Sequence, residues 1–213
     1  MKRTFDIVFS AIGLVFVAPV LTVCALCIKL DSPGPIFYRG LRAGQFGRPF
    51  RIFKLRTMVS NAEQLGGAET PADDPRITRV GGFLRLYKLD ELPQLINVLK
   101  GEMSLVGPRP EVLEEVVNYG ERERELLLVR PGITDSASIK FRHEDELLRG
   151  STDPHAAYHA IIRPEKVRLG LEYVHNHSVL TDCGLILRTL AVLFQPPPDA
   201  CAESLKRTEN IAR

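Results

Sequence analysis

The sequence is poor in several features, and each shortage excludes a class of protein. Four cysteines among 213 residues do not imply a disulfide framework. A formal net charge of +2 excludes a general attraction to nucleic acid, so only local clusters of charge need an explanation. No internal repeat is evident, and the length suits one domain with its own core.

Two of the cysteines, Cys24 and Cys27, have the spacing of a zinc or redox pair. Zinc needs further ligands and a polar surrounding, and the stretch around these cysteines has neither. We therefore expect both to pack within an apolar segment.

One long apolar run stands at the N-terminus. Residues 7–28 carry no charge, and a helix of that length would measure about 33 Å, close to the hydrocarbon core of a bilayer. A cleaved signal peptide has a shorter apolar core followed by a small-x-small site, and neither is present here. We therefore predict a membrane helix over residues 1–30 that stays attached to the chain.

Basic residues flank this run on both sides. Lys2 and Arg3 precede it, and between Lys29 and Arg56 seven basic residues stand against the single acid Asp31. Because the positive-inside bias keeps such flanks in the cytoplasm, a helix that enters and leaves through one leaflet satisfies both ends. The basic cluster also predicts an anionic partner near the membrane surface.

Pro19 stands in the middle of the apolar run. It cannot donate a hydrogen bond to the carbonyl of Val15, so a break or kink is expected over residues 17–19, and a break permits re-entry. An ordinary kinked transmembrane helix is the alternative, because proline is tolerated in such helices. These residues alone favour neither.

Residues 31–195 predict one small α+β domain that is mostly helical. A turn-rich break at residues 31–35 ends the membrane segment. Short strands are expected at 36–38 and 50–56, and a mobile loop at 60–74. Helical patterns fall at 82–87, 92–99, 112–129, 156–173 and 179–194.

The C-terminal part leaves two questions open. The helix at 179–194 is apolar around most of its circumference, so its outer face meets either the membrane or a second subunit, as in a homodimer. The polar tail at 196–213 is expected to be disordered.

Two adjacent acids precede the helix at 92–99. Pro93 is favoured in a first helical turn, so Asp90 and Glu91 are expected at the positive end of the helix dipole, where Gly101 marks the other end. Neighbouring residues lie about 100° apart around a helix, so one carboxylate can attack phosphorus while the other assists. Simple capping is the alternative, and for these two residues alone it is favoured.

Two arginines are held by prolines. Gly107-Pro108-Arg109-Pro110 and Arg130-Pro131-Gly132 restrict where each guanidinium can point, which suits bidentate binding of phosphate. A single constrained arginine is usually part of a structural salt bridge, but here several cations flank a carboxylate pair. The further cations are Lys54, Arg56, Arg85 and Lys88.

At this point the sequence resembles the monotopic phosphoglycosyl transferases. The similar motifs are Asp-Ser-Pro-Gly-Pro-Ile-Phe-Tyr at 31–38, Phe-Lys-Leu-Arg-Thr-Met at 53–58, Leu-Asp-Glu-Leu-Pro-Gln at 89–94, the run at 97–110 that ends in Gly-Pro-Arg-Pro, and Arg-Pro-Gly-Ile-Thr at 130–134. Their order and spacing make the resemblance specific, and it runs from the membrane segment to about residue 194.

The resemblance implies a bacterial enzyme at the cytoplasmic face of the inner membrane. It would transfer a sugar 1-phosphate from a UDP-sugar to undecaprenyl phosphate and release UMP, as the first membrane step of glycoconjugate or exopolysaccharide assembly. Its partners would be these two substrates and membrane lipid, with no nucleic acid. The resemblance also tips the membrane helix toward the re-entrant form, with its break at Pro19.

The site residues that the resemblance implies are assigned by matching motifs. Asp90 is the nucleophile of a covalent intermediate, Glu91 is its partner, and Mg²⁺ is required, with Asp90 also contacting the metal. The cations matched to substrate binding are Arg85, Arg109, Arg130, Lys54 and Arg56. Cations around a carboxylate pair also suit phosphoryl transfer, because this reaction depends on positioning the substrate and on neutralising the charge of its phosphate groups.

Further expectations concern the sugar, the histidines and two competing functions. Residues 135–140 depart from the Gly-Trp-Ala-Gln-Val-Asn found in many members, so the sugar and the pathway stay open. The five histidines, including His175 and His177, form no recognisable ligand set and are interpreted as surface or packing residues. A glycosyltransferase that releases UDP and a non-catalytic membrane scaffold are the competing hypotheses.

Overall fold

The computed structural model describes residues 1–65, 70–71, 73–148 and 152–193. The tail at 196–213 lies outside the described residues, as do Phe194 and part of the loop expected at 60–74. The helices are α1 (Lys2–Asp31), α2 (Ala62–Leu65), α3 (Arg79–Leu86), α4 (Gln94–Lys100), α5 (Leu113–Val117), α6 (Glu121–Arg124), α7 (Ser136–Lys140), α8 (Glu144–Leu147), α9 (Pro154–Ala157), α10 (Arg163–Asn176) and α11 (Val179–Leu193).

Shorter elements lie between these helices. There are 3₁₀ turns η1 (Gln45–Gly47), η2 (Leu89–Glu91) and η3 (Glu125–Leu128), and a π turn η4 (Tyr158–Ile162). The strands are β1 (Phe37–Tyr38), β2 (Leu41–Ala43), β3 (Pro49–Arg51), β4 (Lys54–Leu55), β5 (Ser104–Val106) and β6 (Gly132–Thr134). The predicted class, mostly helical α+β with short strands, is confirmed.

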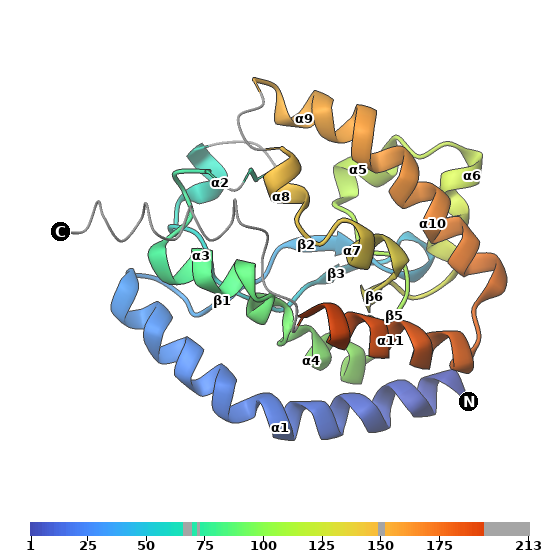
Figure 1. Cartoon of the computed structure of the whole chain (residues 1–213), viewed down its shortest axis with the longest axis horizontal. Coiled ribbons are helices and arrows are strands. Elements are labelled where there is room, and N and C mark those ends of the chain that lie inside the picture. Colours follow the sequence, from blue (N-terminus) through green and yellow to red (C-terminus); the bar gives the residue numbers. More distant parts are fainter. Residues whose placement is uncertain (66–69, 72, 149–151, 194–213) are drawn as a thin grey trace.

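The strands form three separate pairs within the described residues. β1 pairs antiparallel with β4 (Phe37 opposite Leu55), and β2 pairs antiparallel with β3 (Leu41 opposite Arg51). β5 pairs in parallel with β6, with Ser104 opposite Gly132. The helices surround these pairs (Figure 1).

The single strand expected at 50–56 is divided into β3 and β4. The side chain of Asn97 takes the place of a neighbouring strand there: its Oδ1 accepts from the backbone N–H of Phe53 at 2.8 Å, and its Nδ2 donates to the carbonyl of Arg51 at 2.9 Å. The chain can therefore change pairing partner without leaving these backbone groups unsatisfied.

Two predicted helices also differ from the structure. The helix expected at 112–129 is broken at Gly120, whose extended backbone (ψ 171°) precedes α6. The helix expected at 156–173 extends to Asn176, but it opens into the π turn η4 just before Pro164, which has no backbone N–H to donate to the preceding turn.

Helix α1 remains helical through Pro19, and Figure 1 shows it bent around its middle, with both ends directed toward the rest of the protein. Thr22 Oγ1 donates to the carbonyl of Ala18 at 2.9 Å, a side-chain bond that favours bending. The expected kink is therefore present, without a full break. Large apolar side chains on α1 are exposed, among them Val15 and Phe16 at 74% and 78%, as a helix in lipid requires.

Both ends of α1 are anchored to the same body. At its start, Asp6 accepts from the Ser104 hydroxyl (2.9 Å) and from the backbone N–H of Leu105 (3.1 Å). At its end, Ile28 packs in a buried cluster with Leu55 and Leu84. The polar domain therefore covers both ends of a helix that is apolar between them.

Candidate active site

Glu91 lies between two cations. Its Oε1 accepts from Lys54 Nζ at 2.8 Å and from Arg109 Nη2 at 2.6 Å, and its Oε2 lies 3.3 Å from Arg109 Nη1. Burial alone would raise the pKa of Glu91, but Arg109 and Lys54 hold it well below its usual range. The structure thus brings together three residues predicted from separate motifs and keeps Glu91 ionised.

Asp90 is buried beside this group, with 7% of its surface exposed. Its Oδ1 has no hydrogen-bond partner among the described residues. Burial raises the pKa of Asp90, an effect that the charges of Lys54, Lys88 and Arg85 oppose. A buried carboxylate oxygen without a partner costs free energy, so its retention is typical of a functional group.

The two acids do not begin α4, as the proline had suggested. They lie in the 3₁₀ turn η2, and α4 begins only at Gln94, after Pro93. The pKa values of the two acids therefore depend on burial and on neighbouring cations, and not on the dipole of a long helix. Gly101 ends α4 in the left-handed conformation (φ 85°), as predicted.

Arg109 is positioned by the close approach of two loops. Backbone bonds from Gly107 N to the carbonyl of Thr134 (3.1 Å) and from Gly132 N to the carbonyl of Pro108 (2.9 Å) join them. A Cβ on Gly132 would collide with the backbone of Gly107. Both glycines are needed for this contact, which directs Arg109 toward Glu91.

Lys54 is positioned by strand β4, where it lies opposite Tyr38. The residue that holds this strand against α4 is Asn97, which is fully buried and bonds the backbone immediately before Lys54. No separate role was predicted for Asn97, although it begins the motif at 97–110. Within the helical pattern its signal is a polar side chain among apolar ones.

Three predicted substrate ligands bond backbone carbonyls and neither acid within the described residues. Arg85, in the last turn of α3, donates to the carbonyl of Thr70 at 3.4 Å and acts on Asp90 through its charge. Arg56 is buried and donates to the carbonyls of Ser32 (2.8 Å) and Pro33, where it fixes the chain after α1. Arg130 donates to the carbonyl of Gly101 at 3.0 Å, at the other end of α4 from the two acids.

A cavity of about 170 Å³ opens beside Glu91 and Arg109. Its charged end also includes Lys88, Glu144 and Lys166, and Glu144 is paired with Lys166. Glu144 and Lys166 were not identified from sequence, because single charges in a helical pattern carry no distinguishing signal. The rest of the wall is largely apolar and comes from α4, β6, α7 and α11.

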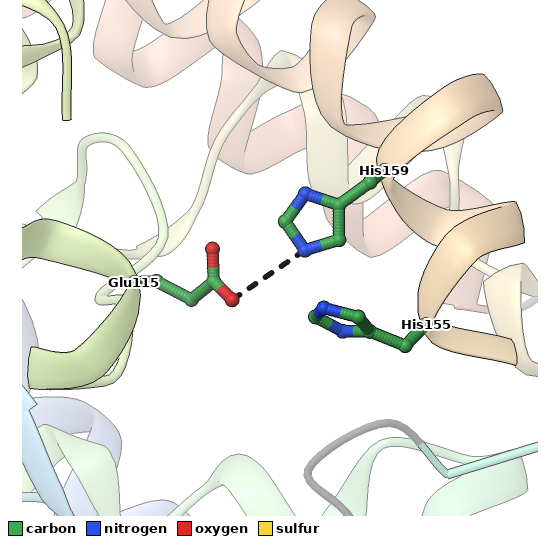
Figure 2. Close-up of side chains that lie close together, drawn as sticks. All are labelled: Glu115, His155 and His159. Atoms are coloured by element: carbon green, nitrogen blue, oxygen red, sulfur yellow. Dashed lines mark ion pairs between the residues drawn. The ribbon is translucent and has the colours of Figure 1, made fainter. Parts of the chain in front are cut away.

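Two histidines come together where the sequence indicated no ligand set. His155 and His159 lie one turn apart and face Glu115 of α5, with Glu115 Oε1 3.4 Å from His159 Nε2 (Figure 2). Their ligand atoms all lie within 4.8 Å of one another, so the geometry could hold a metal ion. Glu115 is also 3.9 Å from Arg163, and we interpret the cluster as ion pairs that join α5 to α9 and η4.

An ionised Glu91 and a buried Asp90 among fixed cations, in a protein with one exposed apolar helix, are typical of a membrane-associated protein that handles phosphate. Comparison with known proteins specifies the class. Residues 1–196 match the family described as "Bacterial sugar transferase". The chain belongs to this family, which confirms the resemblance seen in its motifs.

Several characterised relatives share most of this chain. It is 38% identical over 196 residues to a UDP-glucose:undecaprenyl-phosphate glucose-1-phosphate transferase of Caulobacter vibrioides, covering 91% of this chain and 69% of the relative. It is 39% identical to an Escherichia coli protein of the same name, covering 89% and 39%. It is 43% identical to a UDP-N-acetylgalactosamine-undecaprenyl-phosphate N-acetylgalactosaminephosphotransferase of Aeromonas hydrophila, covering 91% and 44%.

The chain thus spans about two fifths of the length of the second and third of these relatives. The names of the three relatives include two different sugars, and all three name undecaprenyl phosphate and the transfer of a sugar phosphate.

Proposed function

We propose that this protein transfers a sugar 1-phosphate from a UDP-sugar to undecaprenyl phosphate, releasing UMP, through a covalent intermediate on Asp90. The observation that carries the proposal is the difference between the two adjacent acids. Glu91 has two cationic partners, whereas Asp90 Oδ1 is buried without one. An oxygen that has no hydrogen bond to lose is free to form a bond with phosphorus.

The reaction balances in two displacements. In the first, an Asp90 oxygen attacks the phosphorus that carries the sugar, a new P–O bond forms, and the P–O bond to UMP breaks with its electrons leaving on UMP. In the second, an oxygen of undecaprenyl phosphate attacks the same phosphorus and the bond to Asp90 breaks. The products are a polyprenyl diphosphate sugar and the free carboxylate, and no proton need be taken up.

The cations around the acids have defined roles in this scheme. Arg109 and Lys54 keep Glu91 ionised, and Arg109 presents a planar fork that can also reach phosphate oxygens. Lys88 and Arg85 add positive charge near Asp90. Such fixed charges stabilise negative charge on transferring phosphate without the reorganisation that water would require.

The residues fit a magnesium ion. The buried Asp90 carboxylate, whose Oδ1 has no partner among the described residues, calls for a compensating positive charge. Carboxylate oxygens are ligands of the type that Mg²⁺ prefers, and one oxygen can bind the ion while the other attacks phosphorus. We propose that Asp90 holds the ion. When bound, Mg²⁺ would neutralise charge on the substrate phosphates.

We further propose that α1 is re-entrant and that the domain lies on the cytoplasmic face of the bacterial inner membrane. The support is the anchoring of both ends of α1 to one polar body, together with the exposed apolar residues between them. A helix that crossed the bilayer would place its ends on opposite sides. Cysteine labelling tests this: Thr4→Cys, at an exposed position near the start of α1, and Ser32→Cys should react from the same side, in a background without the natural cysteines.

The function is tested by identifying the released nucleotide. Full-length protein in lipid nanodiscs is incubated with Mg²⁺, undecaprenyl phosphate and a panel containing UDP-glucose, UDP-galactose and UDP-N-acetylgalactosamine. We expect UMP from the wild type and none from Asp90→Asn, with the exposed Asp73→Asn as the matched control. Release of UDP would show transfer of the sugar alone, and UMP release by Asp90→Asn would contradict the nucleophile assignment.

A further inference from the structure

The cavity beside Glu91 has a charged end and an apolar end. The apolar end is lined by Leu92, Leu95 of α4, Ile133 of β6, Ile139 of α7 and Val192 of α11, and all five are half-buried. Arg142 also lines the cavity, with its guanidinium donating to the carbonyls of Val192 and Leu193. Thr134 and Thr189, which also line it, bond each other through their hydroxyls at 2.7 Å. A ligand part rich in hydroxyl groups would lose hydrogen bonds to water against such a wall, whereas a hydrocarbon would gain from it.

At the charged end, Lys88 is a cation without a partner. Within the described part of the chain its ammonium group makes no hydrogen bond or ion pair, although Lys54, Arg109 and Lys166 are all paired there. Its backbone is left-handed (φ 55°), a conformation that is strained for a residue with a side chain. An ammonium group that lines a cavity and has no bonded carboxylate among the described residues favours the binding of an anion at this point.

The apolar end reaches the membrane helix. Leu95 lies so close to α1 that a Cβ added at Gly13 would be 3.3 Å from its Cδ1. On the other side of the cavity, α11 carries exposed leucines, Leu187 and Leu190. Figure 1 shows α4 and α11 along the side of the domain that faces α1. A ligand with a hydrocarbon chain could thus enter from lipid without crossing water.

The size of the cavity matches a small hydrocarbon group. A cavity of roughly 150 Å³ lined by apolar side chains holds one benzene molecule, so about 170 Å³ accommodates a group of similar size. One isoprene unit has five carbons and fits this volume. A full polyprenyl chain does not, and its remaining units would lie in lipid.

We propose that this cavity binds the acceptor by its first isoprene unit, with the attached phosphate on Lys88, which lines the cavity two residues before Asp90. The inference rests on the proposed function and adds a location for the acceptor. It predicts that donor and acceptor are recognised separately, and that filling the cavity impairs only the second displacement.

Two tryptophan substitutions on the same helix test the proposal. Val192→Trp fills the cavity, and Leu180→Trp, at an 83% exposed position outside the cavity wall, is the matched control. In nanodiscs without acceptor, the UMP released in the first turnover reports the first displacement. With increasing undecaprenyl phosphate, steady-state transfer gives the KM for acceptor.

We expect Val192→Trp to raise the KM for undecaprenyl phosphate by about tenfold or more while the first-turnover UMP release and the KM for the UDP-sugar stay near wild type. Leu180→Trp should change none of these quantities. An unchanged acceptor KM in Val192→Trp would overturn the proposal, and so would a raised donor KM, which would place the UDP-sugar in the cavity. Absence of UMP release from the wild type would instead contradict the proposed function itself.

A second pair of measurements does not depend on how Val192→Trp folds. Lys88→Gln removes the unpaired charge without adding volume, and it should also raise the KM for acceptor. Dimethylallyl phosphate, a single isoprene unit with its phosphate, should compete with undecaprenyl phosphate in the wild type, whereas inorganic phosphate at the same concentration should not. Equal inhibition by both compounds would show that the isoprene unit is not recognised and would overturn the proposal.

Discussion

Two pairs of carboxylates in this protein are bonded very differently. Asp6 joins α1 to β5 by accepting from Ser104 and Leu105. Asp182 joins α11 to α1 and α10 by accepting from Lys2 (2.5 Å) and from the Tyr173 hydroxyl (2.7 Å). In the other pair, Glu91 is fully bonded and Asp90 is not.

The difference separates a structural role from a chemical one. A buried acid whose oxygens are all bonded contributes to stability, because its removal would leave its partners buried without a hydrogen bond. A buried acid with a partnerless oxygen contributes little to stability, so its presence in the site is explained by a chemical role. Changing one acid of each pair to its amide tests this difference, because activity and stability should respond in opposite ways.

The largest effect is expected for Asp90→Asn. The amide cannot act as the nucleophile, so turnover should fall by at least about 10³-fold, while thermal stability should stay the same or rise because an unpaired buried charge is removed. UMP release and a thermal unfolding curve measure the two quantities. A large loss of stability would instead class Asp90 with the structural acids.

Arg109→Ala should have the next largest effect, a loss of turnover of about 10²-fold. It removes the fork that bonds Glu91 and leaves Glu91 with Lys54 alone. Arg109→Lys keeps the charge and loses the planar geometry, so we expect an intermediate loss. Steady-state kinetics at saturating donor measure both, and equal activity of the two variants would show that charge has no part in the role of Arg109.

Asp182→Asn should show the reverse of Asp90→Asn. It weakens the bonds to Lys2 and Tyr173 and should destabilise the fold by about 2 to 3 kcal/mol, with turnover per folded molecule unchanged. Thermal unfolding in detergent, with activity corrected for the folded fraction, is the measurement. A specific loss of turnover at full stability would contradict the structural role.

The smallest effect is expected for Arg130→Ala. Its guanidinium bonds the carbonyl of Gly101, so its loss should cost about 1 kcal/mol of stability and leave turnover close to wild type. Comparison with Arg109→Ala under the same conditions tests this. An equal loss of turnover in both variants would return Arg130 to the substrate ligands that its motif predicts.

Much of the fold could be predicted because its signals are local. The membrane segment, the stop at Gly101 and the strand at β1 follow from apolar runs, glycine and alternation within a few residues. The division of the strand at 50–56 could not be predicted, because it depends on Asn97, which is distant in sequence.

The two adjacent acids, the cations, the membrane helix and the order of the motifs could all be read from the sequence. Which cation pairs with which acid is known only from the tertiary structure. Lys54 and Arg109 reach Glu91, while Arg56 and Arg130 bind backbone carbonyls elsewhere. The physical reason is that a motif specifies a residue and its local backbone, whereas charge pairing and burial depend on contacts between segments far apart along the chain.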